Sequence, residues 1–552
     1  MNPSKEDILR HAAQLGWPCT DTRAGEIAAN AAATYEQFAR VRGKLHFDVD
    51  TLSLFAVREE VKEKAASDAA HLPPAVSAYA GGSPLHMSLT QAVQAIRDKK
   101  ISSTELTQAS IAAAKAIQPT VNAFVRINEE SALAAARHCD AELAHGDARG
   151  PLHGVPLAHK DMYYRQGLVS TCGSKIRKDW VAPVTAAALE QLDAAGAVQI
   201  GNLNMTEFAY GPTGQNAFLG DAKNPWNPDY ITGGSSSGSG VSVAARVVFG
   251  ALGSDTGGSV RLPASICGLV GMKTTFGRVS RHGAMPLSQS LDTVGPLTRT
   301  VADNALMLGA IAGYDARDPS STMEPVPDYL GSLEAPVEGL RIGRPRGYFD
   351  TALTPEVARL MDTAYDVYRQ LGCEIVDVAM PDLEAANAIG FFLTWGDVIA
   401  IHGKWMRECP DDYTPQTRGR IQTTLAVTTQ AYGDAQRLRG PLLREFCDGV
   451  FNKCDALLAP VLSMPVPQLS EVDVSGGTGM MRILNEITRL MRPINVLGLP
   501  ALSVPAGFTP NGLPCGFQLI GRPFAEAKLY RLGHAYEGET DFAARRPPVC
   551  AD

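Results

Sequence analysis

Residues 232–240 read Thr-Gly-Gly-Ser-Ser-Ser-Gly-Ser-Gly, and after the apolar stretch 241–252, residues 253–261 read Gly-Ser-Asp-Thr-Gly-Gly-Ser-Val-Arg. Two loops rich in glycine and serine therefore flank an apolar helix. A flexible linker has no reason to run directly into an apolar helix and then into a second glycine-rich turn. Consecutive glycines let backbone N–H groups converge on a developing negative charge, as an oxyanion hole requires. The pattern predicts an active site with a serine nucleophile.

A serine hydroxyl is a weak nucleophile at neutral pH and needs a base within hydrogen-bond reach. Histidine is the usual base, but the eleven histidines are spread along the chain and none adjoins either loop in sequence. Lys160 ends the run Gly-Val-Pro-Leu-Ala-His-Lys at residues 154–160 and is a second candidate. The residues alone leave this choice open.

Three segments together resemble the signature of the amidase signature family: Gly-Gly-Ser-Ser-Ser-Gly-Ser at 233–239, Asp-Thr-Gly-Gly-Ser-Val-Arg-Leu-Pro-Ala at 255–264, and Cys-Gly-Leu-Val-Gly-Met-Lys at 267–273. Similar stretches lie at residues 153–161, 206–209, 224–226, 290–296 and 495–507, so the resemblance covers roughly residues 87–536. One departure is Thr274, which follows Lys273 where the family commonly has proline. A second departure is the substantial N-terminal extension before the first family-like helix, and neither departure touches the serine-bearing loops or Lys160.

The resemblance implies an α/β fold in which a large mixed, mostly parallel β-sheet core is surrounded by helices. It implies that Ser259 is the nucleophile, that Ser235 is a bridging serine in a cis conformation, and that Lys160 is the general base. The enzyme would cleave a carbon–nitrogen acyl bond through an acyl-enzyme, without a metal ion or another cofactor. The implied oxyanion hole consists of the backbone N–H groups of Thr256, Gly257, Gly258 and Ser259.

The chain divides into an N-terminal helical extension (residues 1–75), a linker rich in proline and glycine (76–86), and the amidase signature domain (87–545) with a helical, substrate-facing insertion at about 340–490. Apolar residues recur every three to four positions in the extension, which predicts a helix with one buried stripe: Ile27, Ala31, Tyr35, Phe38 and Val41. The extension offers no plausible nucleophile and base. We expect it to cover an apolar face of the enzyme or to serve as an arm for homodimer formation. It is also similar to the small helical C subunit of tRNA-dependent amidotransferases.

Composition excludes several classes of partner. Fifty basic and fifty-eight acidic residues are interspersed, so we expect no nucleic-acid partner. The ten cysteines are scattered and the N-terminus lacks a secretory pattern, which predicts a reduced cytoplasmic protein. The apolar stretch 388–401 contains Asp397 and is shorter than the roughly 20 residues of a membrane span. The expected partners are a small-molecule amide or carbamate and water.

Aromatic and methionine side chains in the insertion, beside the glycine-rich loop 475–479, predict a pliable apolar pocket, although core packing would explain most of them. We therefore expect apolar or aryl amides as substrates. Carbamates (urethanes) present the same carbonyl and nitrogen leaving group. The residues are Phe391, Phe392, Trp395, Trp405, Met480, Met481 and Met491.

Three alternatives remain. The segment Gly-Ser-Ser-Ser-Gly at 234–238 matches a nucleophile elbow, in which Ser236 would attack with a distant histidine as base. The chain could instead be an amidotransferase-like assembly subunit without turnover of its own. His153 and His159 could share one face of a strand and bind a metal, but two such histidines are usually structural.

Overall fold

The computed structural model describes residues 2–46, 49–63, 76, 79, 81–472, 474 and 478–550. Its centre is an eleven-stranded sheet with the strand order β1-β3-β2-β4-β6-β5-β10-β11-β9-β7-β8. The strands are β1 Phe124–Ile127, β2 Pro156–Lys160, β3 Val198–Leu203, β4 Gly250–Asp255, β5 Val270–Lys273, β6 Thr293–Thr298, β7 Arg341–Arg346, β8 Glu374–Ala379, β9 Ala456–Pro460, β10 Ala501–Phe508 and β11 Pro514–Ile520.

The sheet is mixed, as predicted, but the expectation that it is mostly parallel is wrong. Strand β2 pairs in parallel with β3 and β4, and β7 pairs in parallel with β8 and β9. The other six pairings are antiparallel. The reason lies in the connections between strands. Parallel neighbours need a crossover connection, usually a helix, whereas β10 and β11 form a hairpin and no helix lies between β5 and β6.

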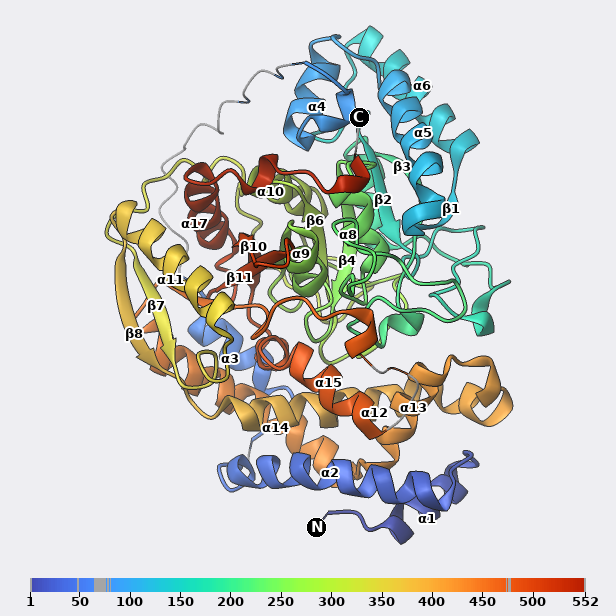
Figure 1. Cartoon of the computed structure of the whole chain (residues 1–552), viewed down its shortest axis with the longest axis vertical. Helices are drawn as coiled ribbons and strands as arrows, with labels where there is room; N and C mark the ends of the chain where they lie inside the picture. The colour runs from blue at the N-terminus through green and yellow to red at the C-terminus, as the bar shows by residue number, and fades with distance from the viewer. Residues whose placement is uncertain are drawn as a thin grey trace.

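Helices cover both faces of the sheet (Figure 1). The capping box predicted at residues 102–105 is present, because the Ser102 side chain accepts the Glu105 N–H while the Glu105 carboxylate accepts the Ser102 N–H. The helix between the two glycine-rich loops, α8, is buried along its whole length. The helices of this layer are α4 Leu89–Arg97, α5 Ser103–Val121, α6 Glu129–His145, α7 Ala187–Ala194, α8 Ser237–Ala244, α9 Arg261–Cys267, α10 Val301–Ile311, α11 Pro355–Gln370 and α17 Glu526–Gly538.

The segment expected to be a helical insertion is only partly helical, because β7, β8 and β9 fall inside it and join the main sheet. Apart from α11, the helices of this segment and a short helix that follows it form a layer at one end of the molecule (Figure 1). This layer comprises α12 Leu383–Glu408, α13 Pro415–Thr423, α14 Thr429–Phe446, α15 Thr478–Thr488 and α16 Arg492–Val496.

The N-terminal extension lies on this layer as α1 Lys5–Leu15, α2 Asp21–Arg42 and α3 Ser53–Val61. The predicted stripe on α2 is buried. The rings of Tyr35 and Phe38 both lie 4.8 Å from the ring of Phe392 on α12. The chain therefore covers the stripe with its own helices and leaves it unavailable to a second copy. Residues 64–75 of the predicted extension lie outside the described residues.

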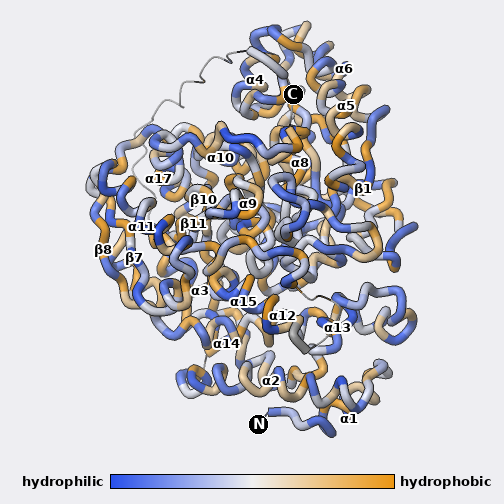
Figure 2. Tube along the Cα trace, viewed as in Figure 1, coloured by the Kyte–Doolittle hydropathy of each residue, from blue (hydrophilic) through white to orange (hydrophobic). Residues whose placement is uncertain are grey.

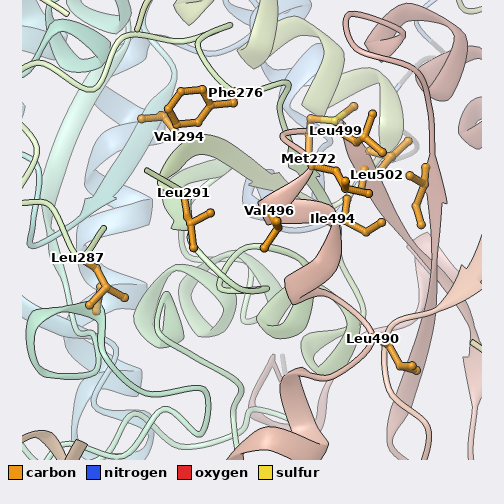
Figure 3. Close-up of a cluster of buried hydrophobic side chains, with 14 of the residues drawn as sticks. Met272, Phe276, Leu287, Leu291, Val294, Leu490, Ile494, Val496, Leu499 and Leu502 are labelled. Carbon is orange, nitrogen blue, oxygen red and sulfur yellow. The ribbon is translucent and has the colours of Figure 1, made fainter. Parts of the chain in front are cut away.

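Hydrophobic packing connects the sheet to the helices. Figure 3 shows part of this core, in which Met272 of β5 and Leu502 of β10 lie near Ile494 and Val496 of α16. The outer helix α2 instead carries both hydrophilic and hydrophobic residues along its length (Figure 2). Among the described helices, α12 is long and apolar enough to cross a membrane, but 72% of its apolar window is buried inside the fold.

Candidate active site

Lys160 ends β2 in the interior of the protein. Its Nζ donates to Ser235 Oγ at 2.7 Å and to Ser254 Oγ at 2.9 Å, and its side chain is fully buried. No carboxylate within the described residues forms an ion pair with it. Burial lowers the pKa of Lys160 to about 7, against the opposing charges of Asp292 and Asp255. A substantial fraction of this amine is therefore neutral near neutral pH.

The loop of Ser235 leads directly into α8. The peptide bond between Gly234 and Ser235 is cis, and the Ser235 carbonyl accepts the N–H of Thr206 at 3.2 Å. The Gly234 N–H donates to the carbonyl of Pro212 at 2.6 Å. A Cβ at Gly234 would lie 2.7 Å from the carbonyl oxygen of Gly211, so this position has room only for glycine. Residues 206–212 thus hold the backbone on both sides of this peptide bond.

The loop of Ser259 is anchored by Asp255, which lies behind it. The Asp255 carboxylate accepts the N–H of Gly258 at 2.8 Å and of Val260 at 3.2 Å, and forms an ion pair with Arg261 at 3.0 Å. Both charged side chains are fully buried. Burial alone would raise the pKa of Asp255, but the Arg261 charge and hydrogen bonds hold it well below its usual range. The carboxylate therefore stays ionised and fixes the loop.

Ser259 is partly exposed as a residue, and its hydroxyl makes no hydrogen bond to any described residue. The structure therefore brings Lys160 and Ser235 together, but it does not join Ser235 and Ser259 by a hydrogen bond. Gly258 also differs from the expectation, because its N–H donates to Asp255 and is not free for an oxyanion. In the described part of the chain, the N–H groups of Thr256, Gly257 and Ser259 make no hydrogen bond.

Two polar residues near Lys160, Ser254 and Asp292, are not among the site residues predicted from the sequence. Ser254 receives a hydrogen bond from the lysine and lies one residue before Asp255. Asp292 accepts the Thr256 hydroxyl at 2.5 Å and the backbone N–H groups of residues 287 and 288. Burial raises the pKa of Asp292 to about 6. Asp292 lies within the family-like stretch 290–296, and this stretch is the feature of the sequence that could have identified it as a site residue.

Ser236, the candidate of the elbow alternative, is fully buried. Its Oγ lies 3.4 Å from the carbonyl oxygen of Ser254 and 3.3 Å from the Ser254 nitrogen, and no histidine bonds to it among the described residues. The geometry thus gives Ser236 neither access to a substrate nor a base.

The residues that could hold a metal ion are poorly suited to it. Potential ligand atoms of Cys139, Glu142 and His153 lie within 4.8 Å of one another. His153, however, uses Nε2 with the Cys139 carbonyl at 3.0 Å and Nδ1 with the Arg149 N–H at 3.1 Å, so neither nitrogen is free to bind a metal. His159 bonds Gln199 through Nδ1 at 3.2 Å, and burial lowers its pKa to about 3.

The side chains expected to form an apolar pocket are largely packed into the core. Phe392 contacts the extension, and Trp405 stacks on Phe208 with ring centroids 5.3 Å apart. Phe391 lies under the guanidinium of Arg492, 4.0 Å from ring to cation. Trp395, Met480, Met481 and Met491 are also buried. Residues 475–477 of the glycine-rich loop lie outside the described residues.

Two buried arginines lie close to each other, and one of them, Arg492, adjoins the loop of Ser259. Arg492 is 7% exposed, and its Nε lies 3.9 Å from the place a Cβ would take on Gly257. Its Nη1 donates to Asn387 Oδ1 at 2.6 Å. Arg420 is 9% exposed, lies 4.2 Å from the ring of Tyr210, and leaves Nε and Nη1 without a hydrogen-bond partner. No described carboxylate forms an ion pair with either arginine.

The two guanidinium groups also repel each other. Burial, together with the charge of Arg420, lowers the pKa of Arg492 to about 10. A buried cation without an anion is unfavourable by several kcal/mol, on the order given for isolated buried ions. The two arginines are therefore buried cations without a described anionic partner.

The site is thus a buried lysine–serine pair beside two glycine-rich loops of a mixed α/β sheet, the class of site that the family comparison identifies. The family model described as Amidase matches residues 105–530, and the chain belongs to this family, the amidase signature family. The predicted family is thereby confirmed, and so is the mixed α/β fold.

Several relatives share this architecture. The A subunit of the glutamyl-tRNA(Gln) amidotransferase of Myxococcus xanthus is 41% identical, covering 81% of this chain and 96% of the relative. Its counterpart from Geobacter metallireducens is 38% identical, covering 82% and 97%. A solved structure of a vestigial protein complex bearing on the origins of an s-triazine catabolic enzyme is 33% identical, with a TM-score of 0.77 and coverage of 82% and 98%. The peptide amidase of Stenotrophomonas maltophilia is 30% identical, with a TM-score of 0.70 and coverage of 84% and 98%.

Proposed function

We propose that this protein is an amidohydrolase that cleaves a carbon–nitrogen acyl bond through an acyl-enzyme on Ser259, with Ser235 and Lys160 as its proton relay. The observation that carries the proposal is the 2.7 Å hydrogen bond between the buried Lys160 amine and the Ser235 hydroxyl, beside a loop that presents Ser259. A reduced, cytoplasmic setting accords with ten cysteines that form no disulfide.

The chemistry follows from this arrangement. Neutral Lys160 takes the proton of Ser235 while Ser235 takes that of Ser259, whose oxygen attacks the carbonyl carbon. The Ser259 hydroxyl must turn toward Ser235 for this step, and catalytic hydrogen bonds often form only when substrate is bound. The proton then passes back through the relay to the leaving nitrogen, because an unprotonated amine leaves poorly. Water attacks the acyl-enzyme by the same route in the second half-reaction.

The tetrahedral oxyanion would be stabilised by the free N–H groups of Thr256, Gly257 and Ser259. Removing one such donor typically costs about 3–4 kcal/mol of transition-state stabilisation. Asp255 contributes by fixing the loop that carries these groups, and it does not contact the reacting atoms.

For the substrate, the arginines revise the expectation of a purely apolar amide. Arg420 and Arg492 lack a carboxylate partner from the described part of the protein, so the substrate that fits is an amide bearing an anionic group, most simply a carboxylate. The rest of the substrate can still be an aryl or alkyl group, although Phe391 itself is buried beneath Arg492. Carbamates (urethanes) with the same charged group can follow the same chemistry.

The alternative from another class is an amidotransferase-like assembly subunit, which the names of the relatives favour. It predicts no hydrolysis by the purified chain and turnover only after a partner chain is added. Formation of a homodimer would not supply this partner chain, because both subunits of a homodimer are the same protein.

The test is a comparison of matched substrates with the purified chain. Pairs of amides that differ only by a carboxylate and its neutral methyl ester, in primary, N-aryl and carbamate forms, are assayed for release of ammonia or amine. We expect kcat/KM to be about 10- to 100-fold higher for the carboxylate members, since charged hydrogen bonds contribute about 1.5–3 kcal/mol. Equal rates within each pair would remove the anionic specificity, and no turnover of any compound would favour the assembly subunit.

A further inference from the structure

A second cationic site lies away from the catalytic loops. A cavity of about 510 Å³ is lined by residues that include Arg246, Arg299, Ala302, His534 and Arg546. Arg246 comes two residues after the end of α8, whose first turn follows Ser235, and Arg299 directly follows β6. Both arginines thus lie at the ends of these elements that are remote from the catalytic residues. No residue proposed for catalysis lines this cavity.

Arg246 is a buried cation without an anionic partner. It is 8% exposed, and its terminal nitrogens meet backbone carbonyl oxygens at long distances: 3.3 Å to His86 and 3.2 Å to Ala543. Its Nε is buried and has no hydrogen-bond partner among the residues that the structure describes. No described carboxylate forms an ion pair with it. A guanidinium in this state has donor capacity that the protein leaves unused.

Arg299 lies beside it and is 4% exposed. Within the described chain, Arg299 hydrogen-bonds only to backbone carbonyl oxygens, those of Val248 at 3.2 Å and of Met87. Burial, together with the neighbouring charge of Arg246, lowers the pKa of Arg299 to about 10. The two cations therefore stand close enough to repel each other, which an anion between them would relieve.

The acidic residues nearby serve other groups. Glu537 accepts the N–H of Val301 at 3.1 Å, at the start of α10. Asp303 accepts the N–H of Thr90 at 2.9 Å. Neither carboxylate forms an ion pair with Arg246 or Arg299 within the described residues. The cavity thus retains an excess of positive charge.

We infer that this cavity is a binding site for a phosphate-class oxyanion, with Arg246 and Arg299 as its principal cations. Its volume exceeds that of a phosphate ion, so the oxyanion could be free phosphate or the phosphoryl group of a small metabolite. Guanidinium groups suit such ligands because they offer several N–H donors in a plane. The inference stands apart from the proposed catalytic function.

The test is calorimetric titration of the purified chain with inorganic phosphate and, separately, with ribose 5-phosphate, at constant ionic strength set with NaCl. We expect saturable binding of at least one probe, and Arg246→Gln or Arg299→Gln should weaken it at least tenfold. Tighter binding of ribose 5-phosphate would assign the site to phosphoryl metabolites, and tighter binding of phosphate would assign it to the free ion.

Two further variants make the result decisive. Ala302→Glu places a carboxylate in the cavity without removing any arginine contact, and an acidic residue is tolerated in the first turn of α10. It should abolish binding even if Arg246→Gln folds poorly. Arg137→Gln, on the exposed side of α6, is the matched control and should bind like wild type. Absence of saturable binding of both probes, or binding by Ala302→Glu equal to wild type, would overturn the inference.

Discussion

The ammonium nitrogen of Lys160 lies 2.7 Å from the Ser235 hydroxyl oxygen, and the other acceptor of the lysine is the equally neutral hydroxyl of Ser254. Neither acceptor stabilises a positive charge as a carboxylate would. A lysine placed in this way can lose its proton near neutral pH, which is the property that a general base requires.

The first prediction concerns the serines. Ser259→Ala should abolish turnover, because no other hydroxyl of the loops is both exposed and near the free N–H groups. Ser235→Ala should leave a small residual activity, and Ser236→Ala should have a mild effect because the Ser236 hydroxyl hydrogen-bonds only with the Ser254 backbone among the described residues. Steady-state kinetics of the three purified variants measures this. A Ser236→Ala variant as inactive as Ser259→Ala would establish the elbow alternative instead.

The second prediction concerns pH. Because burial lowers the pKa of Lys160 from 10.5 to about 7, kcat/KM should rise with pH through an acidic limb near 7. Lys160→Ala should lose most activity with the fold intact, as circular dichroism would show. Lys160→Arg should be no better, since arginine stays protonated. Near-normal turnover by the arginine variant would leave Lys160 with only an electrostatic or structural role.

The same shift affects stability, with a definite sign. Between pH 7 and 10.5 the unfolded chain holds a proton on Lys160 that the folded chain has lost, so this group makes the free energy of unfolding rise with pH. Lys160→Met should lack this contribution and gain stability at pH 7, by up to about 4 kcal/mol. Urea unfolding at pH 7 and 9.5 measures it. An equal pH dependence in both proteins would argue against a shifted lysine.

The third prediction concerns substrate recognition. Arg420→Met and Arg492→Met should each reduce kcat/KM for the carboxylate-bearing amide about 10- to 100-fold and change the rate for its methyl ester little. Arg418→Met is the matched control, because Arg418 lies on α13 with Arg420 and pairs with Asp411 at the surface. Equal losses for both substrates would indicate a structural role for the two arginines.

The fourth prediction concerns the extension. Phe38→Ala should lower the free energy of unfolding by about 3–5 kcal/mol, because Phe38 is buried against Phe392. Deletion of residues 1–81 should lower solubility, since it exposes this face of α12. Glu36→Ala, at an exposed position of the same helix, is the control and should leave stability unchanged. A truncated protein that is equally soluble, keeps its oligomeric state and loses activity would show that the extension shapes the active site.

The glycine-rich loops and Lys160 could be predicted because each is a short, continuous motif. Asp292, Arg420 and Arg492 could not be singled out in this way. The two arginines lie in or at the start of helices whose local sequence carries no chemical signal, and only the fold brings Arg492 beside Gly257. The prediction of mostly parallel strand pairing is wrong for a related reason. Alternating apolar runs and helical stretches do not reveal which strands, such as β10 and β11, form an antiparallel hairpin.

The most direct test of the central claim is to identify the serine that a fluorophosphonate labels, by mass spectrometry after trypsin digestion. Trypsin separates the candidates, because Ser259 falls in the peptide of residues 247–261 while Ser235 and Ser236 fall in that of residues 224–246. We predict one label, on Ser259, and its loss in Lys160→Ala at neutral pH. A label on Ser236 or Ser235, with Ser259 unmodified, would contradict the account.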